Sequence, residues 1–401
     1  MSADFDAAKA LFVEGNAHFE GRRFAQAEGC FRASLALLPG RVSTLANLAA
    51  TLIALQRDAE ALDAAGQALA VAPDDVQALA QRGLALNHLQ RPQEAIAVLD
   101  RLVALAPQWP LAWLHHAQTL QLLGRLKAAV ASYDRCLALD PQLGDAWGQR
   151  GGALKDLGDV QGAVASFEQA IAAGADAAFY AYCLAGSRPG PLPPPAAPRG
   201  FVQRLFGAYA EGFDEHLVQG LGYRVPQALA ALPGPGRRWR SALDLGCGTG
   251  LCGEAFAGRV QRLVGLDLSS AMLARAAARG RYAELLQAEL VEHLVQTPAQ
   301  YELLLAADVF IYVGDLDPVL AAASRVLHPG GDLLFSLEAG DHVEPYRLQA
   351  SLRYSHSAAA LRAQAVRHGL VVQEVVPATL REEQRHPVAG WLVWLQRPGR
   401  P

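Results

Sequence analysis

Four glycines follow an apolar run in the stretch LDLGCGTGLCG, residues 243–253. Glycine has no side chain, so Gly246, Gly248, Gly250 and Gly253 allow a tight turn and a close approach of a ligand to the backbone. The last three of these also fit the Gly-x-Gly-x-x-Gly spacing of dinucleotide-binding turns. The stretch therefore predicts a site for a nicotinamide dinucleotide or for another adenosine cofactor.

Two aspartates narrow the chemistry of this cofactor. Asp267 ends the next apolar run, 19 residues beyond Gly248. A carboxylate at that position can accept hydrogen bonds from two ribose hydroxyls, which both kinds of cofactor offer. Asp244 lies inside the first run, where its negative charge disfavours a pyrophosphate. The same charge favours a cofactor that carries cationic groups.

A sheet must bring these residues to one edge. Between residues 201 and 401 strand-like apolar runs alternate with helix-like runs. This alternation indicates a mostly parallel sheet that helices cover on both faces. Ligands bind such sheets at the carboxyl ends of the strands, near the point where the strand order reverses. The expected strands are 241–246, 262–268, 283–289, 301–310, 331–338, 370–376 and 389–396, and the expected helices are 251–258, 269–280, 316–327 and 357–369.

The ordered motifs of this region resemble those of class I S-adenosylmethionine (SAM)-dependent methyltransferases. The motifs LDLGCGTG, VGLDLSSAMLARA, AADVFIYVGDL and LHPGG follow one another in that order, and the resemblance covers almost all of residues 201–401. It implies a Rossmann-like domain with a mostly parallel seven-stranded sheet whose last strand is antiparallel. It also implies SAM as the cofactor, whose ammonium and sulfonium groups suit Asp244.

The resemblance also implies roles for individual residues. Glu289 stands where many members of the family have an aspartate, and its longer side chain makes a surface role an open alternative. For Tyr209, Phe213 and Met272, a plain core position remains the alternative. The implied cofactor-binding residues are Asp244, Gly246, Cys247, Gly248 and Gly250 at the methionine part, Asp267 at the ribose, Leu268, Met272 and Glu289 near the adenine, Asp308 at the methionine end, and Tyr209 and Phe213 over the cofactor.

Methyl transfer requires an acceptor placed in line and shielded from water, and it requires a base only when the acceptor loses a proton. His216, His356 and Tyr354 are the candidates for catalysis or for contact with the acceptor. A hydrogen-bonded surface or capping position is the alternative for both histidines. No acidic and histidine cluster has metal-ligand spacing, so no metal is expected. The sequence identifies neither the acceptor molecule nor the acceptor atom.

An internal repeat fills the first half of the chain. Pro39, Pro73, Pro107 and Pro141 recur every 34 residues, and each ends a helical apolar pattern. Alanine stands twelve residues before each proline, a large apolar residue or alanine eight before it, and glycine or alanine twenty-four before it. Small residues allow two helices to approach closely, and stacked helix pairs bury a common core. The period resembles the tetratricopeptide repeat (TPR). Five repeats are expected over 8–176, with a sixth helix at 177–185 covering the end.

The inner face of such a repeat array suggests a protein or peptide partner. The alternative is a solvated polar face. The candidate lining residues are Asn16, Asn47, Arg82, Asn87, His115, His116 and Arg150.

Composition sets the remaining limits. The chain has 401 residues, a formal net charge of −4 and 52% hydrophobic residues. Without a basic excess, nucleic acid is not an expected partner. We see no apolar run long enough for a transmembrane helix and no signal peptide, so no membrane and a cytoplasmic location are expected. The expected domains are a TPR solenoid at 1–185, a Pro/Gly-rich linker at 186–200 and a methyltransferase domain at 201–401.

Two functions follow from this combination. The chain resembles a bacterial family of predicted methyltransferases with TPRs, which implies methyl transfer from SAM to an unidentified acceptor, with repeats that recruit a substrate or partner. The alternative is a TPR scaffold whose methyltransferase-like domain binds SAM but is catalytically silent.

Overall fold

The structure, a computed structural model, describes residues 2–188, 193–383 and 385–399. The chain divides into two compact units, Met1–Tyr180 and Ala181–Pro401. The expected linker at 186–200 includes residues 189–192, which lie outside the described residues. The boundary between the units falls inside helix α11 (Ala177–Ser187), earlier than the expected boundary.

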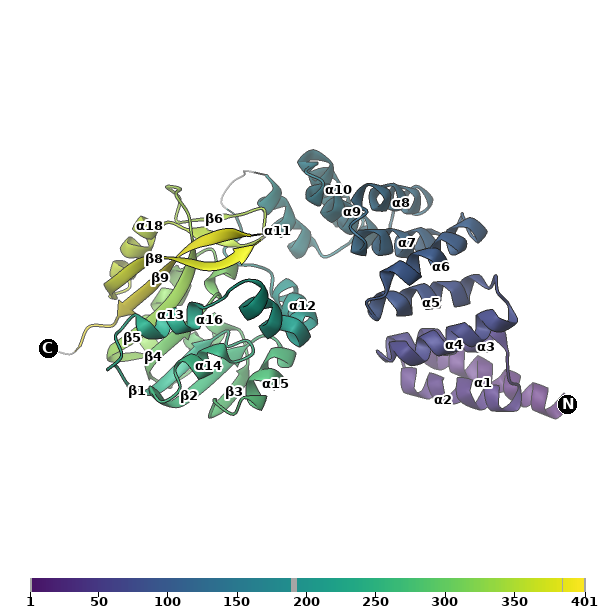
Figure 1. Cartoon of the computed structure of the whole chain (residues 1–401), viewed down its shortest axis with the longest axis horizontal. Helices are drawn as coiled ribbons and strands as arrows, with labels where there is room; N and C mark the ends of the chain where they lie inside the picture. The colour runs from purple at the N-terminus through teal and green to yellow at the C-terminus, as the bar shows by residue number, and fades with distance from the viewer. Residues whose placement is uncertain (1, 189–192, 384, 400–401) are drawn as a thin grey trace. The chain divides into compact units, whose positions relative to one another are not determined.

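The described part of the first unit contains five successive pairs of α-helices, in agreement with the five expected repeats (Figure 1). The pairs are α1 (Ser2–Glu20) and α2 (Phe24–Leu37), α3 (Val42–Ala54) and α4 (Asp58–Val71), α5 (Val76–His88) and α6 (Pro92–Leu105), α7 (Pro110–Leu122) and α8 (Leu126–Leu139), and α9 (Gly144–Asp156) and α10 (Val160–Ala172).

The small residues in the repeat columns mark the places where two helices touch. A Cβ atom on Gly15 would lie 2.6 Å from Phe31, and one on Gly151 would lie 2.6 Å from Phe167. The recurring alanines are fully buried; they are Ala27, Ala61, Ala95, Ala129 and Ala163. The turn between the two helices of each pair also repeats, with a positive φ at Arg22, Gln56, Gln90, Gly124 and Gly158. The same packing between the two helices of a pair thus recurs in all five repeats.

Helix α11 contributes side chains to both units. Tyr180 stacks on Phe167 with ring centroids 5.9 Å apart, as expected of a helix that covers the end of the repeats. In the second unit, the Tyr182 hydroxyl donates to the Leu352 carbonyl at 2.7 Å, and its ring packs against Tyr354. The expectation for 177–185 therefore holds for the first part of the helix only.

The second unit contains a sheet whose order along the main path is β3-β2-β1-β4-β5-β7-β6. The strands are β1 (Trp239–Leu245), β2 (Val260–Asp267), β3 (Glu284–Gln287), β4 (Tyr301–Ala306), β5 (Leu327–Ala339), β6 (Tyr346–Leu348), β7 (Tyr354–His356), β8 (Val371–Glu383) and β9 (His386–Gln396). Strands β1 to β5 pair in parallel, and β9 lies antiparallel between β5 and β8. The order reverses between β1 and β4.

The mostly parallel sheet with an antiparallel β9 agrees with the expected Rossmann-like architecture. Two short strands that the sequence did not predict, β6 and β7, extend it to nine strands. β6 and β7 are only three residues long, too short for an apolar period to mark them.

Alternate residues of the central strands face two separate cores. Leu243 and Leu245 contribute to one core, together with side chains of α16 (Leu290–Gln296), α17 (Asp317–Val326) and α18 (Ala358–Arg367). Ala242 contributes to the other, with α13 (Val225–Ala231) and α14 (Leu251–Ala255). The helices therefore cover both faces and leave the carboxyl ends of the strands free for a site.

Candidate active site

The glycine loop follows β1 directly and has a conformation that favours glycine. Gly246, Gly248 and Gly250 have φ values of 65°, 54° and 94°. A side chain on Gly246 would also clash, because its Cβ would lie 2.7 Å from Val309. These positions explain why the sequence carries glycine at each of them.

Asp267 anchors this loop to the end of β2. Its Oδ2 accepts a hydrogen bond from the Gly248 amide at 2.9 Å, and its Oδ1 accepts one from the Ser269 amide at 2.8 Å. Burial raises the pKa of Asp267, and the two backbone amides oppose that rise. Each oxygen retains a second lone pair, so the carboxylate can still accept hydrogen bonds from a ligand.

Asp244 lies beneath the loop with one oxygen unsatisfied. Its Oδ2 accepts a hydrogen bond from the Tyr282 hydroxyl at 2.7 Å. Its buried Oδ1 has no hydrogen-bond partner among the described residues. Burial raises the pKa of Asp244 to about 7, although the Tyr282 hydrogen bond opposes the shift. A cation placed near this oxygen would satisfy it and would lower that pKa.

Tyr282 also engages the backbone that would have to bind a pyrophosphate. Its hydroxyl accepts a hydrogen bond from the Gly253 amide, in the first turn of α14, at 3.3 Å. A Cβ on Gly253 would lie 3.0 Å from the Tyr282 ring, so this glycine is needed for packing. The third glycine of the pattern is thus needed for close packing, a role that it also has in dinucleotide-binding turns, so Gly253 does not distinguish the two kinds of cofactor.

A cavity of about 910 Å³ runs along the carboxyl ends of the strands. It lies near the top of the range for small-molecule sites, roughly 300–1,000 Å³. Its wall includes Gly246, Cys247, Gly248 and Thr249 after β1, Asp267 and Leu268 at β2, Glu289 after β3, and Asp308 after β4. The strand order places Glu289 and Asp308 on opposite sides of the glycine loop, so the cavity has a half over β1–β3 and a half over β4–β5.

Residues 199–220, which we call the cover segment, form another wall of this cavity. They include α12 (Arg199–Tyr209), the 3-10 helix η1 (Ala210–Gly212) and the π-helix η2 (Glu215–Gly220). Tyr209, Phe213 and His216 all line the cavity. The Tyr209 ring lies edge-on to Phe213 at 5.2 Å and to His216 at 5.5 Å. Aromatic rings thus face the space above the glycine loop.

Asp214 attaches the cover segment to the glycine loop. Its Oδ1 accepts a hydrogen bond from the Thr249 hydroxyl at 2.5 Å. Its Oδ2 pairs with Arg279 at 2.5 Å, and Arg279 also donates to the Thr249 carbonyl at 2.7 Å. These contacts hold the aromatic wall at a fixed place relative to the loop.

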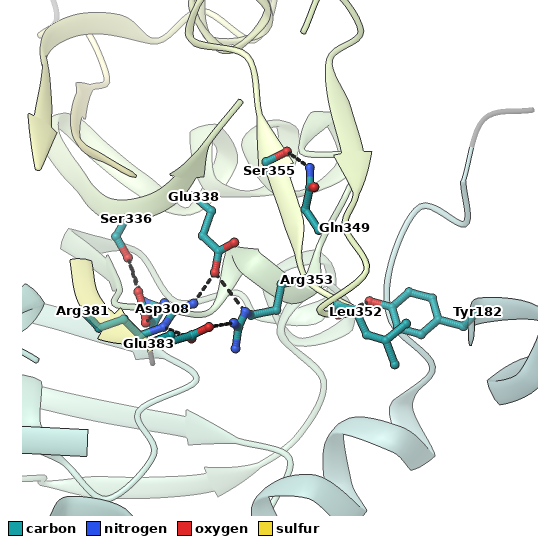
Figure 2. Close-up of polar contacts among 10 residues, drawn as sticks. All are labelled: Tyr182, Asp308, Ser336, Glu338, Gln349, Leu352, Arg353, Ser355, Arg381 and Glu383. Atoms are coloured by element: carbon teal, nitrogen blue, oxygen red, sulfur yellow. Dashed lines mark hydrogen bonds and ion pairs between the residues drawn. The ribbon is translucent and has the colours of Figure 1, made fainter. Parts of the chain in front are cut away.

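Five charged side chains, which we call the charged cluster, gather at the β4–β5 half (Figure 2). They are Asp308, Glu338, Arg353, Arg381 and Glu383. Arg381 is only 3% exposed and pairs with Asp308 at 2.7 Å, with Glu383 at 2.7 Å and with Glu338. The Arg353 Nε lies 3.0 Å from Glu338, and its Nη2 donates to Glu383. All of them except Glu338 line the cavity.

Burial and pairing act in opposite directions on the acids of this cluster. Burial raises the pKa of Asp308 and of Glu338, while Arg381 opposes the shift in both. For Glu383 burial also disfavours the charged form, but the charges and hydrogen bonds of Arg381 and Arg353 together outweigh it and lower the pKa. Asp308 has a positive φ of 57° and accepts a further hydrogen bond from the Ser336 hydroxyl at 3.1 Å.

Most of the sequence-predicted cofactor residues line this one cavity. They are Gly246, Cys247, Gly248, Asp267, Leu268, Glu289, Asp308, Tyr209 and Phe213. Asp244 and Gly250 are not part of the cavity wall: Asp244 is buried near the end of β1, and Gly250 lies in the glycine loop itself. Met272 is 1% exposed in α15 (Ser270–Ala278) and is absent from the cavity wall, which favours the alternative of a plain core position. Glu289 lines the wall but also caps α16, because it accepts a hydrogen bond from the Glu292 amide at 2.8 Å.

Of the three catalytic candidates, only His216 lines the cavity. Tyr354 is fully buried, and its hydroxyl donates to the Pro194 carbonyl at 2.6 Å. His356 is 2% exposed, and its Nε2 lies 2.9 Å from the Val313 carbonyl. Burial lowers the pKa of His356 to about 4. Strand β7 directs both side chains into the interior, which favours structural roles for Tyr354 and His356 over the predicted catalytic ones.

The sequence reasoning missed several residues of the site. Asp214, Arg279 and Tyr282 support the glycine loop, and Arg353 and Arg381 form the basic part of the charged cluster. None has a spacing that marks it, since each acts through a partner far away in the chain: 73 residues separate Arg381 from Asp308. The one available signal was the charged stretch LREE, residues 380–383, between two predicted apolar strands.

In the first unit, several expected partner-binding side chains already bond to one another. Asn47 donates to Asn16 at 2.8 Å, and Asn87 donates to Thr119 at 2.7 Å. His116 is nearly buried between Ser132 and Asp100. Arg150 pairs with Asp134 and Ser166. The first helix of each pair thus carries a row of polar groups.

One group of potential metal ligands occurs among the described residues, namely Glu14, His18 and Cys30. The Arg23 Nε donates to the His18 Nδ1 at 2.9 Å, so the ring proton of a neutral His18 lies on Nε2, toward Glu14. A guanidinium at this distance also disfavours a cation. The geometry gives no support for a metal.

Comparisons with known proteins match the two units separately. A family model described as a methyltransferase domain matches residues 242–331, and tetratricopeptide repeat models match 76–119, 111–143 and 144–173. Among the solved structures, a pilF protein from Pseudomonas aeruginosa is 17% identical and covers 46% of this chain and 83% of its own, with a TM-score of 0.42.

The curated relatives match the second unit only in part. The ubiquinone biosynthesis O-methyltransferase of Hahella chejuensis is 33% identical over 139 residues, which is 34% of this chain and 56% of the relative. The malonyl-[acyl-carrier protein] O-methyltransferase of Alcanivorax borkumensis is 34% identical over 153 residues, which is 35% of this chain and 48% of the relative. The chain therefore spans about half the length of the curated relatives it matches.

Fold, site and comparisons together define a protein that joins tetratricopeptide repeats to a Rossmann-like methyltransferase domain. In the described part of the chain, no helix is both long and apolar enough to cross a membrane.

Proposed function

We propose that the chain is a SAM-dependent methyltransferase whose repeats bind a protein partner or a protein substrate. The observation that carries this proposal is Asp244, a carboxyl group buried next to the glycine loop whose Oδ1 has no hydrogen-bond partner among the described residues. A buried carboxylate with a free oxygen favours a cationic ligand over an anionic one.

The residues of the β1–β3 half fit SAM in their chemistry. Asp244 and the glycine loop would hold the methionine part, with its ammonium group. Asp267 would accept hydrogen bonds from the ribose hydroxyls. Leu268 and Glu289 would contact the adenine, and Tyr209 and Phe213 would cover the cofactor. When bound, SAM supplies an electrophilic methyl group.

The β4–β5 half would receive the acceptor. The cavity volume leaves room there for a second molecule beside the cofactor. The cover segment would exclude water, and the ring of His216 would face the acceptor, where it can orient a protic group or take up its proton. The names of both curated relatives describe O-methyltransferases, which supports an oxygen acceptor.

The repeats support a protein partner by their architecture. Stacked helix pairs form an extended surface, and its row of amide side chains can hydrogen-bond to the backbone of an extended peptide. In this proposal the partner is the substrate, or brings it.

The experiment is a calorimetric titration of the full chain with SAM, S-adenosylhomocysteine (SAH) and NAD, followed by incubation with methyl-labelled SAM and candidate acceptors. We expect binding of SAM and SAH, no binding of NAD, and transfer of label. Binding without transfer to any acceptor would favour the silent scaffold, and binding of NAD alone would refute the cofactor assignment.

A further inference from the structure

The acceptor half of the cavity has an unusual balance of charge. The charged cluster contains three carboxyl groups, Asp308, Glu338 and Glu383, and only two guanidinium groups, Arg353 and Arg381. Within the described residues, both arginines direct their ion pairs at the cluster's own acids. The cluster therefore offers no uncompensated positive charge to a ligand.

The direction of the guanidinium N–H groups leads to the same conclusion. Arg381 uses Nε for Glu383, Nη1 for Asp308 and Nη2 for Glu338. A further anion would become the fourth acid beside two bases, in a place where Arg381 is almost completely shielded from water. Even if one carboxyl group kept its proton, both arginines would still form ion pairs within the cluster. The buried Nε of Arg353 lacks a hydrogen bond, but it lies 3.0 Å from the Glu338 carboxylate. Repulsion from the carboxylates at such a site strongly disfavours the binding of an anion.

The rest of this half is apolar and aromatic. Phe206 lies edge-on to Tyr312 at 5.5 Å, and Val309, Ile311 and Val313 complete the wall. Apolar walls with a few polar groups at one end are typical of sites for amphipathic small molecules or for one large side chain. An acceptor must therefore have an apolar body and one polar end.

We propose that the acceptor is an apolar molecule or side chain that presents an uncharged hydroxyl group, and not a carboxylate or a phosphate, to the charged cluster. This inference rests on the proposed function. A hydroxyl can donate its hydrogen bond to Asp308 or Glu383, both of which line the cavity. An amine would instead be held as an ammonium ion by the excess of negative charge, and an ammonium ion has no lone pair with which to accept a methyl group.

The test compares two probes of equal shape, 4-hexylphenol and 4-hexylbenzoate. Their binding to the full chain is measured at pH 8 with saturating SAH. We expect the phenol to bind at least about tenfold more tightly than the benzoate. Glu383→Gln removes one acid from the cluster and should reduce this preference severalfold. Glu302→Gln, which removes an arginine-paired acid outside the cavity wall, serves as the matched control and should leave the preference unchanged.

The outcomes separate this inference from the function on which it rests. If SAH does not bind, the proposed function fails. If SAH binds but the benzoate binds as tightly as the phenol, or neither probe binds, the inference about the acceptor is overturned alone. It is also overturned if Glu383→Gln and Glu302→Gln change the preference equally.

Discussion

Replacing Asp267 by asparagine should weaken cofactor binding by an amount that can be worked out from its contacts. The carboxylate accepts hydrogen bonds from two backbone amides, those of Gly248 and Ser269. Asparagine has one acceptor oxygen and one NH₂ group, so it must turn its donor toward one of those amides. That amide then lacks an acceptor, which costs roughly 1–3 kcal/mol of folding free energy.

The ligand loses a charged acceptor at the same time. A hydrogen bond to a charged group contributes roughly 1.5–3 kcal/mol. With 1.4 kcal/mol for each factor of ten, the Kd for SAH should rise roughly 10- to 150-fold. The assay is calorimetric titration with SAH, with thermal unfolding measured on the same preparation to separate a folding defect from a binding defect.

Asp317→Asn is the matched control. Both oxygens of Asp317 also accept hydrogen bonds, from His368 and Arg367 at 2.7 Å each, and this residue does not line the cavity. The control should lose stability without losing affinity. If Asp267→Asn binds SAH as tightly as the unsubstituted chain while remaining folded, the assignment of Asp267 to the ribose is refuted.

Further predictions concern the base, the pH dependence, the core and the domain boundary. His216→Ala should reduce methyl transfer roughly 100-fold or more and leave the Kd for SAH unchanged; a kcat that does not change would remove His216 from the mechanism. Since burial raises the pKa of Asp244 to about 7, its ionised form, which in our proposal favours the ligand ammonium, is lost below that pH. The affinity for SAH should therefore rise from pH 6 to pH 8, and in Asp244→Asn the same titration should be flat. Asp332, fully buried, accepts hydrogen bonds from Arg237, Trp239, Trp394 and Gln396, so Asp332→Ala should lose roughly 3–5 kcal/mol in urea unfolding, and a loss below about 1 kcal/mol would contradict this. A chain that starts at residue 186 lacks Tyr182. Its free energy of unfolding should be roughly 3–5 kcal/mol lower than that of a chain that starts at 177. Equal stability of the two chains would contradict this prediction.

The repeats could be predicted from the sequence because the two helices of each repeat pack against each other in the same way. The distance between two helices of a pair is set by local residues, such as Gly15 against Phe31. The same contact recurs between Gly151 and Phe167. The spacing of small and large residues in the sequence therefore predicts how closely the two helices of each pair pack. The glycine loop was predictable for a related reason, since positive φ at Gly246, Gly248 and Gly250 restricts the residue type at each position.

The acceptor half could not be predicted in this way. Arg353 precedes β7, and Arg381 lies near the end of β8, so their place beside Asp308 depends on the order of the strands. The stretch RYSHS reads as a loop before a helix, and only the pairing of β7 with β5 and β6 buries Tyr354 and His356. Strand order is a property of the whole sheet and leaves no local pattern.

The balance of satisfied and unsatisfied groups favours a binding site over a purely structural domain. Asp332, deep in the sheet, has donors on both oxygens, as a structural buried carboxylate requires. Asp244, equally buried, has a donor on one oxygen only. Such a group destabilises the fold unless something pairs with it. A domain that served only as a scaffold would gain stability from asparagine or an apolar residue at this position. In our proposal, a cationic ligand at the glycine loop accounts for this buried acid, and Asp244→Asn would bind that ligand more weakly in a more stable fold.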